Sequence, residues 1–500
     1  MSASRPVILW FRQDLRLQDN PAAQAAAATG RPLLPIYILD DDNAGEWRMG
    51  AASRWWLHLS LGSLNESLGG SLRFFAGRAD EVLPRLAKNL DAWAVYWNRC
   101  YEPWRIDRDR GIKAELRSNA CHVESFNGSL LFEPQTVMKA DGSPYKVFTP
   151  FYRKGCLQGL PEPAAPEAAA RIDEYCDAQL GHSLEELALL PEIRWYEEMQ
   201  SSWMPGEAGA SERLDRFLEA GVRGYKEGRN RPDLEHVSRL SPHLHFGEIS
   251  PRQVWHAAKS KMAVASLEKD VDHFLSELGW REFSHNLLYH WPTLPRSNLQ
   301  ARFDRFPWRQ DDEALERWQR GQTGYPIVDA GMRELWRTGY MHNRVRMIVG
   351  SFLVKNLLLH WHHGEDWFWD TLVDADLANN SASWQWIAGC GADAAPYFRI
   401  FNPVTQGKKF DPEGSYVRQY VPELADLPDK VLHSPWEASS DVLAAAGVDL
   451  GVSYPHPIVP LKASRERALA AFQSPVSYTH LTLPTKIVSC RGGGGAGGGG

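Results

Sequence analysis

The sequence lacks the patterns that mark secreted, membrane and metal-binding proteins. No apolar run approaches the ~18 residues of a membrane-spanning helix. The N-terminus has no basic region followed by a long apolar stretch, so we do not expect a signal peptide. None of the six cysteines forms a CxxC pair, which excludes an ordinary zinc or iron–sulfur site. Scattered thiols are typical of a reducing compartment, so we predict a cytoplasmic protein without a metal.

An excess of positive charge is also missing. Lysine and arginine total 55 against 62 aspartates and glutamates, which gives a formal charge of −7. This excludes a histone-like protein that holds nucleic acid by bulk charge, although a local basic groove stays open. The 500 residues, 43% hydrophobic and 23% charged, predict an ordinary globular protein of two or three domains.

Tryptophan is the residue in excess, with 21 copies. Eleven of them lie between Trp255 and Trp386. Core packing rarely demands so much indole, because each ring also carries an N–H group that needs a partner when it is buried. The excess therefore asks for a functional reason.

The first 135 residues alternate short β-branched runs with amphipathic segments. The predicted strands are 7–10, 34–39, 72–75, 94–98 and 121–126, and the predicted helices are 22–28, 54–68, 81–90 and 108–119. This alternation predicts an α/β domain with a doubly wound parallel sheet. The loop after the first strand has no GxGxxG pattern, which argues against a dinucleotide bound in the Rossmann manner.

The rest of the chain changes character twice. Residues 136–205 contain a stretch rich in Pro, Ala and Glu and are predicted to connect two domains. Residues 206–473 show apolar spacings of three and four with little alternation, which predicts an all-α domain. Residues 474–500 end in a glycine-rich run; we expect them to be disordered, and whether they are native stays open.

Two segments of the predicted helical domain place charged residues where they could bind a ligand. Residues 223–261 have a local charge of +4, and Ser238, Arg239 and Ser241 stand at a predicted helix start that would attract phosphate. An ordinary serine cap beside a solvated arginine is the alternative. Glu277, Trp280, Arg281 and Ser284 share one helix face, which a salt-bridged surface helix would also produce.

Two further segments place amides and acids among apolar residues. Asn343, Arg346 and Met347 lie at positions i, i+3 and i+4 of one helix face. Residues 374–386 hold two acids, two amides and two tryptophans, and buried polar groups of this kind need partners that a large polar heterocycle would supply. A polar turn with two core tryptophans is the alternative.

Seven segments together resemble the photolyase and cryptochrome family. They are FRQDLRLQDNP (11–21), SRLSPHLHFGEIS (238–250), WREF (280–283), TGYPIVDAGMRELWRTGYMHNRVRM (323–347), DADLANN (374–380), WQWIAG (384–389) and DAAPYFRIFNPVTQGKKFD (393–411). The resemblance runs in order from about residue 5 to residue 472. It is strongest to bacterial photolyases for cyclobutane pyrimidine dimers, in the class III group near plant cryptochromes.

The resemblance implies a U-shaped FAD in the helical domain. The residues expected to bind it are Tyr225, Val237, Ser238, Arg239, Leu240, Ser241, Arg281, Arg346, Asp374, Asp376 and Asn380. Arg346 and Asp374 would form an ion pair beside the isoalloxazine, Asp376 would hydrogen-bond the ring, and Asn380 would face its N5. Val237 departs from the family pattern, because many relatives carry threonine there.

The same resemblance implies an electron path and a lesion pocket. Trp384, Trp361 and Trp308 match an electron-transfer triad, in order outward from the flavin. Glu277, Trp280, Asn343, Met347 and Trp386 are the expected catalytic residues. The expected DNA contacts are Arg229, Glu277, Trp280, Asn343, Arg344, Arg399 and Gln406. A flipped pyrimidine dimer would stack on the tryptophans.

The leading hypothesis is a deoxyribodipyrimidine photo-lyase that uses blue light and reduced FAD to split cyclobutane pyrimidine dimers in ultraviolet-damaged DNA. Such an enzyme is expected to act as a monomer and not to bind a membrane. A cryptochrome-type photoreceptor is the alternative, opposed by Asn380 where plant cryptochromes usually carry aspartate. A (6-4) photolyase is a third hypothesis. That family has a histidine-containing lesion motif at the place where this chain reads HNRVRM, residues 342–347.

A second, antenna chromophore is expected in the first domain, with methenyltetrahydrofolate favoured. The familiar folate pattern has an Asn-Glu pair after Tyr-Glu, whereas here Tyr101-Glu102-Pro103 is followed by Trp104 and Arg105. Trp104 could stack on a pterin and Arg105 could meet a glutamate tail. A loop tryptophan packed at the domain interface is the alternative.

Overall fold

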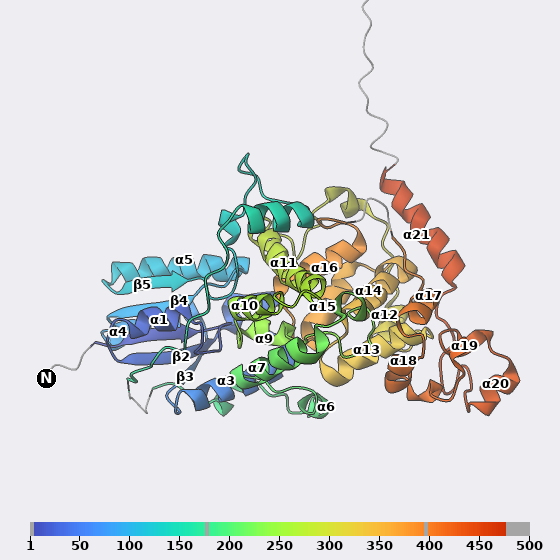
Figure 1. Ribbon diagram of the computed structural model, residues 1–500, viewed down its shortest axis with the longest axis horizontal. Helices are drawn as coiled ribbons and strands as arrows, with labels where there is room; N and C mark the ends of the chain where they lie inside the picture. Colours follow the sequence, from blue (N-terminus) through green and yellow to red (C-terminus); the bar gives the residue numbers. More distant parts are fainter. Residues whose placement is uncertain (1–4, 176–179, 395–398, 477–500) are drawn as a thin grey trace, which may run out of the picture.

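The computed structural model describes residues 5–175, 180–394 and 399–476. A sheet domain lies at one end of the molecule and a larger helical domain at the other (Figure 1). Most of the predicted tail lies outside the described residues, but helix α21 (Leu461–Val476) enters its first three positions. Among the described residues, no helix is long and apolar enough to cross a membrane.

Five parallel strands form the sheet, in the order β3-β2-β1-β4-β5. They are β1 (Val7–Phe11), β2 (Leu33–Leu39), β3 (Arg73–Ala76), β4 (Ala94–Asn98) and β5 (His122–Phe126). Val7 of the central strand lies opposite Leu33 on one side and Ala94 on the other. Strand β1 is buried along its whole length, which explains its unbroken apolar run. The predicted strands and the doubly wound sheet are confirmed.

Helices cover both faces of this sheet. The four long ones are α1 (Pro21–Ala27), α3 (Ala51–Ser67), α4 (Ala79–Asn89) and α5 (Pro103–Ser118), and a short α2 (Asp41–Ala44) follows β2. Helices α1 and α3 pack with alternate β1 residues on one face, and α4 and α5 pack on the other. Strand order reverses between β1 and β4, where such sheets usually bind ligands at the carboxyl ends of the strands.

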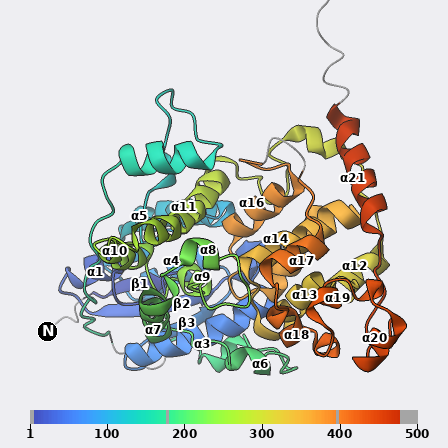
Figure 2. The same ribbon diagram turned by 45° about the vertical axis from the view of Figure 1, so that its right-hand side comes forward.

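The second domain is helical, as predicted: no strand occurs in the described residues after 206. Its helices are α7 (Glu207–Arg216), α8 (Tyr225–Gly228), α9 (Ser241–Phe246), α10 (Pro251–Lys261), α11 (Glu268–His290), α12 (Asp312–Gln319), α13 (Pro326–Thr338), α14 (Asn343–Ser351), α15 (Trp361–Thr371), α16 (Leu377–Ala388), α17 (Pro403–Phe410), α18 (Ser415–Tyr420), α19 (Asp429–Leu432), α20 (Ser440–Ala445) and α21; a short α6 (Glu197–Gln200) precedes them. Helix α16 lies beside both α11 and α14 in the middle of this domain (Figure 2).

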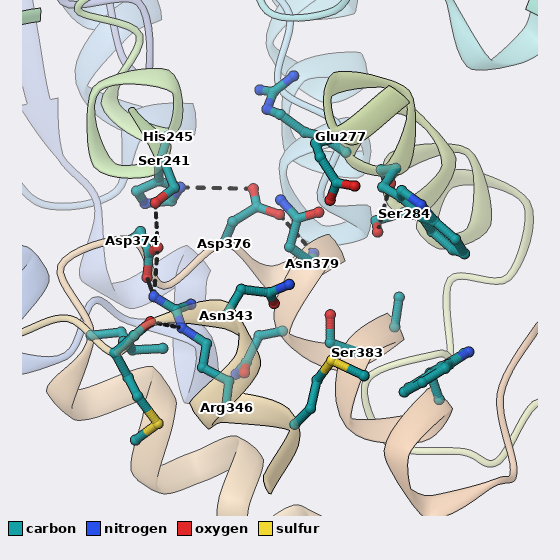
Figure 3. Close-up of a pocket in the computed structure, with 18 of the residues that line it drawn as sticks. Ser241, His245, Glu277, Ser284, Asn343, Arg346, Asp374, Asp376, Asn379 and Ser383 are labelled. Atoms are coloured by element: carbon teal, nitrogen blue, oxygen red, sulfur yellow. Dashed lines mark hydrogen bonds and ion pairs between the residues drawn. The ribbon is translucent and has the colours of Figure 1, made fainter. Parts of the chain in front are cut away.

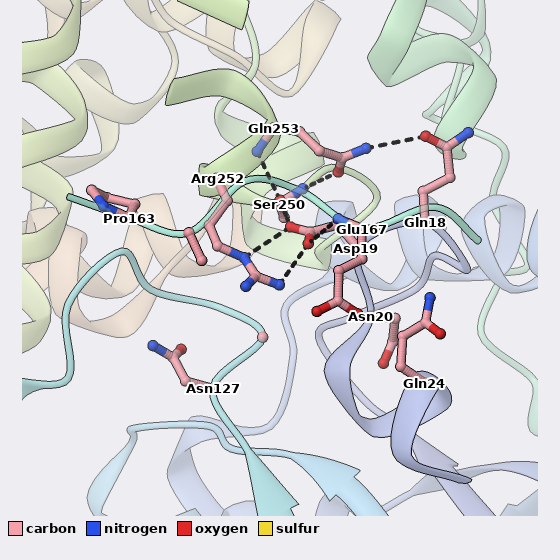
Figure 4. Close-up of polar contacts among 12 residues, drawn as sticks. Gln18, Asp19, Asn20, Gln24, Asn127, Pro163, Glu167, Ser250, Arg252 and Gln253 are labelled. Carbon is pink, nitrogen blue, oxygen red and sulfur yellow. Dashed lines mark hydrogen bonds and ion pairs between the residues drawn. The ribbon is translucent and has the colours of Figure 1, made fainter. Parts of the chain in front are cut away.

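The loop after β1 joins the two domains through a buried aspartate (Figure 4). Asp19 accepts hydrogen bonds from the Arg252 guanidinium at 2.5 and 3.1 Å and from the Ser250 hydroxyl, at the start of α10. It also accepts from the Glu167 backbone N–H at 3.0 Å, in the segment predicted to connect the domains. A buried charge is tolerated when it is paired and hydrogen-bonded in this way, so the motif at residues 11–21 fixes the domain arrangement. The predicted connector boundaries, 136 and 205, stay predictions.

Candidate active site

A cavity of about 550 Å³ lies inside the helical domain, between α8, α9, α11, α14, α15 and α16. It gathers most of the residues that the sequence singled out (Figure 3). The predicted residues that line it are Tyr225, Arg229, Ser238, Leu240, Ser241, Glu277, Trp280, Arg281, Asn343, Arg344, Arg346, Met347, Asp374, Asp376, Asn380, Trp384 and Trp386. Its volume lies in the range that binds cofactors and other small molecules.

An ion pair holds one end of the cavity. The Arg346 guanidinium lies 2.9 and 3.1 Å from the two carboxylate oxygens of Asp374, and it donates to the Met341 carbonyl at 2.7 Å. The Ser241 hydroxyl donates to the same carboxylate at 2.6 Å. Because Asp374 comes from the loop before α16 and Arg346 from α14, the pair ties two elements together beside the cavity.

Asp376 begins α16 and faces two histidines. Its carboxylate accepts from the Asn379 backbone N–H at 2.8 Å as the helix N-cap. His285 Nε2 lies 3.4 Å and His245 Nδ1 3.7 Å from the other oxygen. Burial alone would raise the pKa of Asp376, but the charges and hydrogen bonds of the two histidines outweigh it and hold that pKa well below its usual range. Asp376 is thus an ionised acceptor at the cavity wall.

Asn380 is anchored from behind. Its side-chain Nδ2 donates to the Glu365 backbone carbonyl at 2.9 Å, so its Oδ1 remains to accept from a group in the cavity. The Glu365 carboxyl itself accepts from the Ser381 hydroxyl at 2.5 Å and lies 3.1 Å from the Arg296 guanidinium. Burial raises the pKa of Glu365 to about 8, against the Ser381 hydrogen bond and the Arg296 charge. Behind Asn380, burial therefore favours the protonated form of the Glu365 carboxyl.

The opposite wall is charged and aromatic. Arg229 Nη1 donates to the Glu277 carboxylate at 2.6 Å and lies 3.0 Å from His273 Nε2. Burial raises the pKa of Glu277, against the charge and hydrogen bond of Arg229. The Trp280 ring stacks on Phe148 with ring centroids 3.8 Å apart and planes 9° apart. One face of the Trp280 indole is therefore covered from within the protein, and the cavity is left to the other.

Four arginines give this acidic protein a local positive field. Burial and the charges of Arg229, Arg239, Arg344 and Arg346 lower the pKa of His342 to about 3. His342 caps α14, and its buried Nε2 has no hydrogen-bond partner among the described residues. Three of these arginines, Arg229, Arg344 and Arg346, line the cavity although the chain as a whole carries −7.

Comparison with known proteins identifies the family. Residues 7–168 match the family model described as DNA photolyase, and residues 274–474 match the FAD binding domain of DNA photolyase. The chain is 49% identical over 473 residues to a deoxyribodipyrimidine photo-lyase of Agrobacterium fabrum, an alignment that covers 93% of this chain and 97% of the relative. This chain belongs to the DNA photolyase family.

Two further relatives show how the family divides. A crystal structure of a bacterial class III photolyase from Agrobacterium tumefaciens superposes with a TM-score of 0.91 at 48% identity, covering 95% of this chain and 98% of the other. Cryptochrome-2 of Arabidopsis thaliana is 38% identical over 93% of this chain and 78% of its own length. The predicted family and fold are confirmed, and the helical half is the FAD-binding domain of a photolyase-family protein.

The three tryptophans of the expected photolyase triad differ in exposure. Trp384 lines the cavity and is 3% exposed, Trp361 is fully buried, and Trp308 is half-buried. A Cβ added at Gly364 would lie 2.0 Å from the Trp384 ring, so Gly364 is what lets this ring press against α15, one turn beyond Trp361. The Trp361 Nε1 donates to Asn298 at 3.0 Å.

Besides Trp308 and Trp361, four predicted site residues do not line the cavity. Arg239, in a left-handed backbone conformation with φ +52°, turns its guanidinium toward Glu334 at 3.8 Å and over the Tyr340 ring. Val237 is half-buried beside the cavity-lining Ser238. The other two are Arg399, which is exposed, and Gln406, which lies on α17.

Some residues of the site were not singled out in the sequence. His245 lies inside a motif that was recognised, and no spacing rule separates it from the other residues there. His285 is one turn beyond Arg281 on α11, so the helix face that carries Glu277 could have included it. Phe148 comes from the predicted connector, and only the tertiary contact with Trp280 reveals it.

A second, much smaller cavity of about 40 Å³ lies at the carboxyl ends of β1 and β2. Trp10, Tyr37, Trp104 and Arg105 are among its lining residues. The Arg105 guanidinium lies over the Trp104 ring, 4.8 Å from the centroid. The buried Trp10 Nε1 has no hydrogen-bond partner among the described residues. This second cavity lies at the position where sheets of this topology bind ligands.

Proposed function

We propose that this chain is a deoxyribodipyrimidine photo-lyase that splits cyclobutane pyrimidine dimers in DNA under blue light. One observation carries the proposal: a single cavity is lined both by the residues expected to bind a flavin and by an acid and two indoles, Glu277, Trp280 and Trp386. A cofactor and a flipped pyrimidine dimer would meet in that space. The family relationship supports the same reaction, since the relative that is 49% identical carries the name deoxyribodipyrimidine photo-lyase.

The residues on the inner side of the cavity fit FAD. Ser241 and the backbone around Ser238 would meet the phosphates, and the Arg346–Asp374 pair would lie beside the ring system. Asp376 would accept from a ring N–H, and Asn380 would offer Oδ1 to N5. When bound, reduced FAD supplies a light-excited one-electron donor. The side chains contribute position and charge.

The residues on the outer side fit a pyrimidine dimer. Trp280, backed by Phe148, and Trp386 would stack on the flipped bases, each contact worth roughly 1–3 kcal/mol. Glu277 would hydrogen-bond the base edges after Arg229 releases it toward a phosphate. Asn343 and Met347 complete this side of the cavity.

The DNA backbone would lie across the positive groups at the cavity mouth. Arg229 and Arg344 line the cavity, and the exposed Arg399 and the half-buried Gln406, which lies on α17, extend the surface beyond it. Phosphate contacts of this kind position a nucleic acid without reading its sequence, so a local patch suffices for a protein of net charge −7.

The three tryptophans would carry electrons from the surface to the flavin when it is oxidised. Trp384 would pass an electron to the flavin, Trp361 would refill Trp384, and Trp308 would refill Trp361. Their order from buried to half-buried supports this direction. Indole is suited to the task because it can lose one electron and survive as a radical.

A methenyltetrahydrofolate antenna is proposed for the second cavity, with Trp104 stacking on the pterin and Arg105 meeting the glutamate tail. The orphaned Trp10 Nε1 and the position at the strand ends support a ligand there. A volume of about 40 Å³ is smaller than a pterin, so the Arg105 guanidinium would have to leave the Trp104 ring for the folate to enter.

We also propose a cytoplasmic monomer. The cysteines Cys100, Cys121, Cys156 and Cys390 are free and buried, which fits a reducing compartment. Sedimentation of the full chain at micromolar concentration would test the oligomeric state.

Repair of a defined substrate tests the function. Ultraviolet-irradiated oligothymidylate is mixed with the purified chain that carries reduced FAD, with and without blue light. We expect the thymine absorbance to return only in the light. A cryptochrome-type photoreceptor would photoreduce its flavin without restoring that absorbance. Photoreduction without recovery of the thymine absorbance would contradict the lyase hypothesis.

A further inference from the structure

A histidine ring lies between the two outer tryptophans of the proposed electron path. The His360 ring centroid is 5.2 Å from that of Trp308, with the planes at 64°, and 5.6 Å from that of Trp361, with the planes at 26°. His360 thus fills the space between the surface end of the path and its buried middle.

The backbone holds His360 firmly in this position. His360 is the N-cap of α15, and its Nδ1 accepts from the His362 backbone N–H at 3.2 Å. Leu358, two residues before His360, adopts a left-handed conformation with φ +58°. Its carbonyl accepts from the Arg309 backbone N–H at 2.8 Å. The strand-like segment that carries Trp308 is therefore tied to the turn that presents His360.

The ring is also uncharged at neutral pH. Burial and the neighbouring His362 and His363 lower the pKa of His360 to about 4, against the opposing charge of Asp366. Protonation would place a cation between two indoles, each of which must become positive in turn. It would also remove the lone pair with which Nδ1 caps α15.

The geometry points to His360 as a positioning residue of the electron path: its ring keeps Trp308 at a fixed distance from Trp361. This inference rests on the proposed function, specifically on the tryptophan path. In that path one electron passes from Trp308 to oxidised Trp361. Trp308 then loses its indole proton to water, and a thiol in solution returns one hydrogen atom to it and becomes a thiyl radical.

Three variants of the FAD-loaded full chain separate the ring from the cap. His360→Asn keeps a side chain that caps helices and removes the ring. His360→Phe keeps a flat ring and removes the cap. His363→Ala is the matched control, since His363 is exposed two residues beyond Trp361 on the same helix. Flavin content and thermal unfolding establish that each variant is folded.

We expect His360→Asn to slow photoreduction of oxidised FAD by dithiothreitol on the order of tenfold, because misplacing reacting groups by about 1 Å can cost that much or more. His360→Phe and His363→Ala should stay within about twofold of the parent chain. In the dark, hydroxyl-radical footprinting of the same proteins should show more oxidation of Trp308 in His360→Asn than in His360→Phe.

Either of two results would overturn the role of His360. One is parent-like photoreduction and footprinting in His360→Asn, and the other is a folded His360→Phe that is as slow as His360→Asn. Repair by enzyme reduced beforehand should be unchanged in all three variants. Loss of repair in the parent chain would instead overturn the proposed lyase function, and it is measured separately from the photoreduction rates.

Discussion

The two sides of the large cavity differ in charge and in solvent exposure. On the side proposed to meet the lesion, Glu277 and Arg229 form an ion pair whose side chains are 27% and 17% exposed. Behind the side proposed to lead into the electron path, Trp361 and Glu365 are fully buried. Under the proposed function, the first side admits a nucleic acid, and its charges are held where water or phosphate can reach them. The second side excludes water, so that a charge would move along indoles without a shell of solvent to reorganise.

Two carboxyls show the consequence of this difference. Glu277 is balanced by an arginine at 2.6 Å, and burial shifts the pKa of its carboxyl upward against that charge. Glu365 meets Arg296 only at 3.1 Å, and burial raises the pKa of its carboxyl to about 8. The same chemical group is therefore partly exposed beside its arginine on one side and fully buried on the other, where burial favours its protonated form.

The strongest test of this difference between the two sides removes Trp308, the surface end of the proposed electron path. Trp308→Phe should block photoreduction of oxidised FAD by an external reductant, because phenylalanine is not oxidised in place of indole. Repair by enzyme reduced beforehand should remain nearly intact, since it passes electrons directly between flavin and lesion. Continuous-illumination absorbance and a repair assay measure the two quantities. A fall in repair of about tenfold or more would mean that Trp308 serves both sides.

Glu277→Ala should produce the converse pattern. Lesion binding should weaken by roughly tenfold to a hundredfold, because a charge-assisted hydrogen bond contributes roughly 1.5–3 kcal/mol. FAD content and photoreduction should not change. Titration of dimer-containing oligonucleotide by fluorescence anisotropy measures the affinity, and Glu268→Ala, an exposed acid on the same helix, is the control. Loss of the flavin in Glu277→Ala would give Glu277 a structural role in its place.

The dryness of the electron-path side should appear in the pH dependence of stability. Glu365 has a pKa of about 8 in the folded chain against about 4.5 when unfolded, so the folded state holds the proton more tightly. The free energy of unfolding should therefore fall as pH rises from about 5 to about 8, by an amount on the order of a few kcal/mol.

Glu365→Gln should flatten that slope, because glutamine does not titrate. Urea unfolding between these pH values measures it. The matched control is Asp366→Asn, since Asp366 also lies 3.1 Å from Arg296 but is exposed. Equal slopes in the parent chain and in Glu365→Gln would show that Glu365 is ionised in the folded protein and that this side is wetter than its neighbours suggest.

The smallest effect concerns the second cavity. Trp104→Ala should remove the near-ultraviolet absorption band from protein reconstituted with methenyltetrahydrofolate, because the pterin loses its stacking partner. Repair driven by light that the flavin itself absorbs should stay the same. Reconstituted parent protein that shows only flavin bands would argue against a folate antenna altogether.

The sequence alone predicted the architecture well, because its signals there are local. Apolar runs bounded by turns placed the strands to within one residue at each end, and β1 is apolar throughout since both of its faces are covered. The candidate residues of the cavity also came from the sequence, through short motifs on single helices. The structure brings most of them to one space.

Tertiary structure decided how those residues are used. Sequence patterns cannot show that Phe148 backs Trp280, that Arg239 points its guanidinium at Glu334, or that a histidine lies between two tryptophans. Each of these contacts joins segments far apart in the chain, or depends on one backbone angle such as the φ of +52° at Arg239. Local periodicity determines which face of a helix is buried, and only packing between elements determines what that face meets.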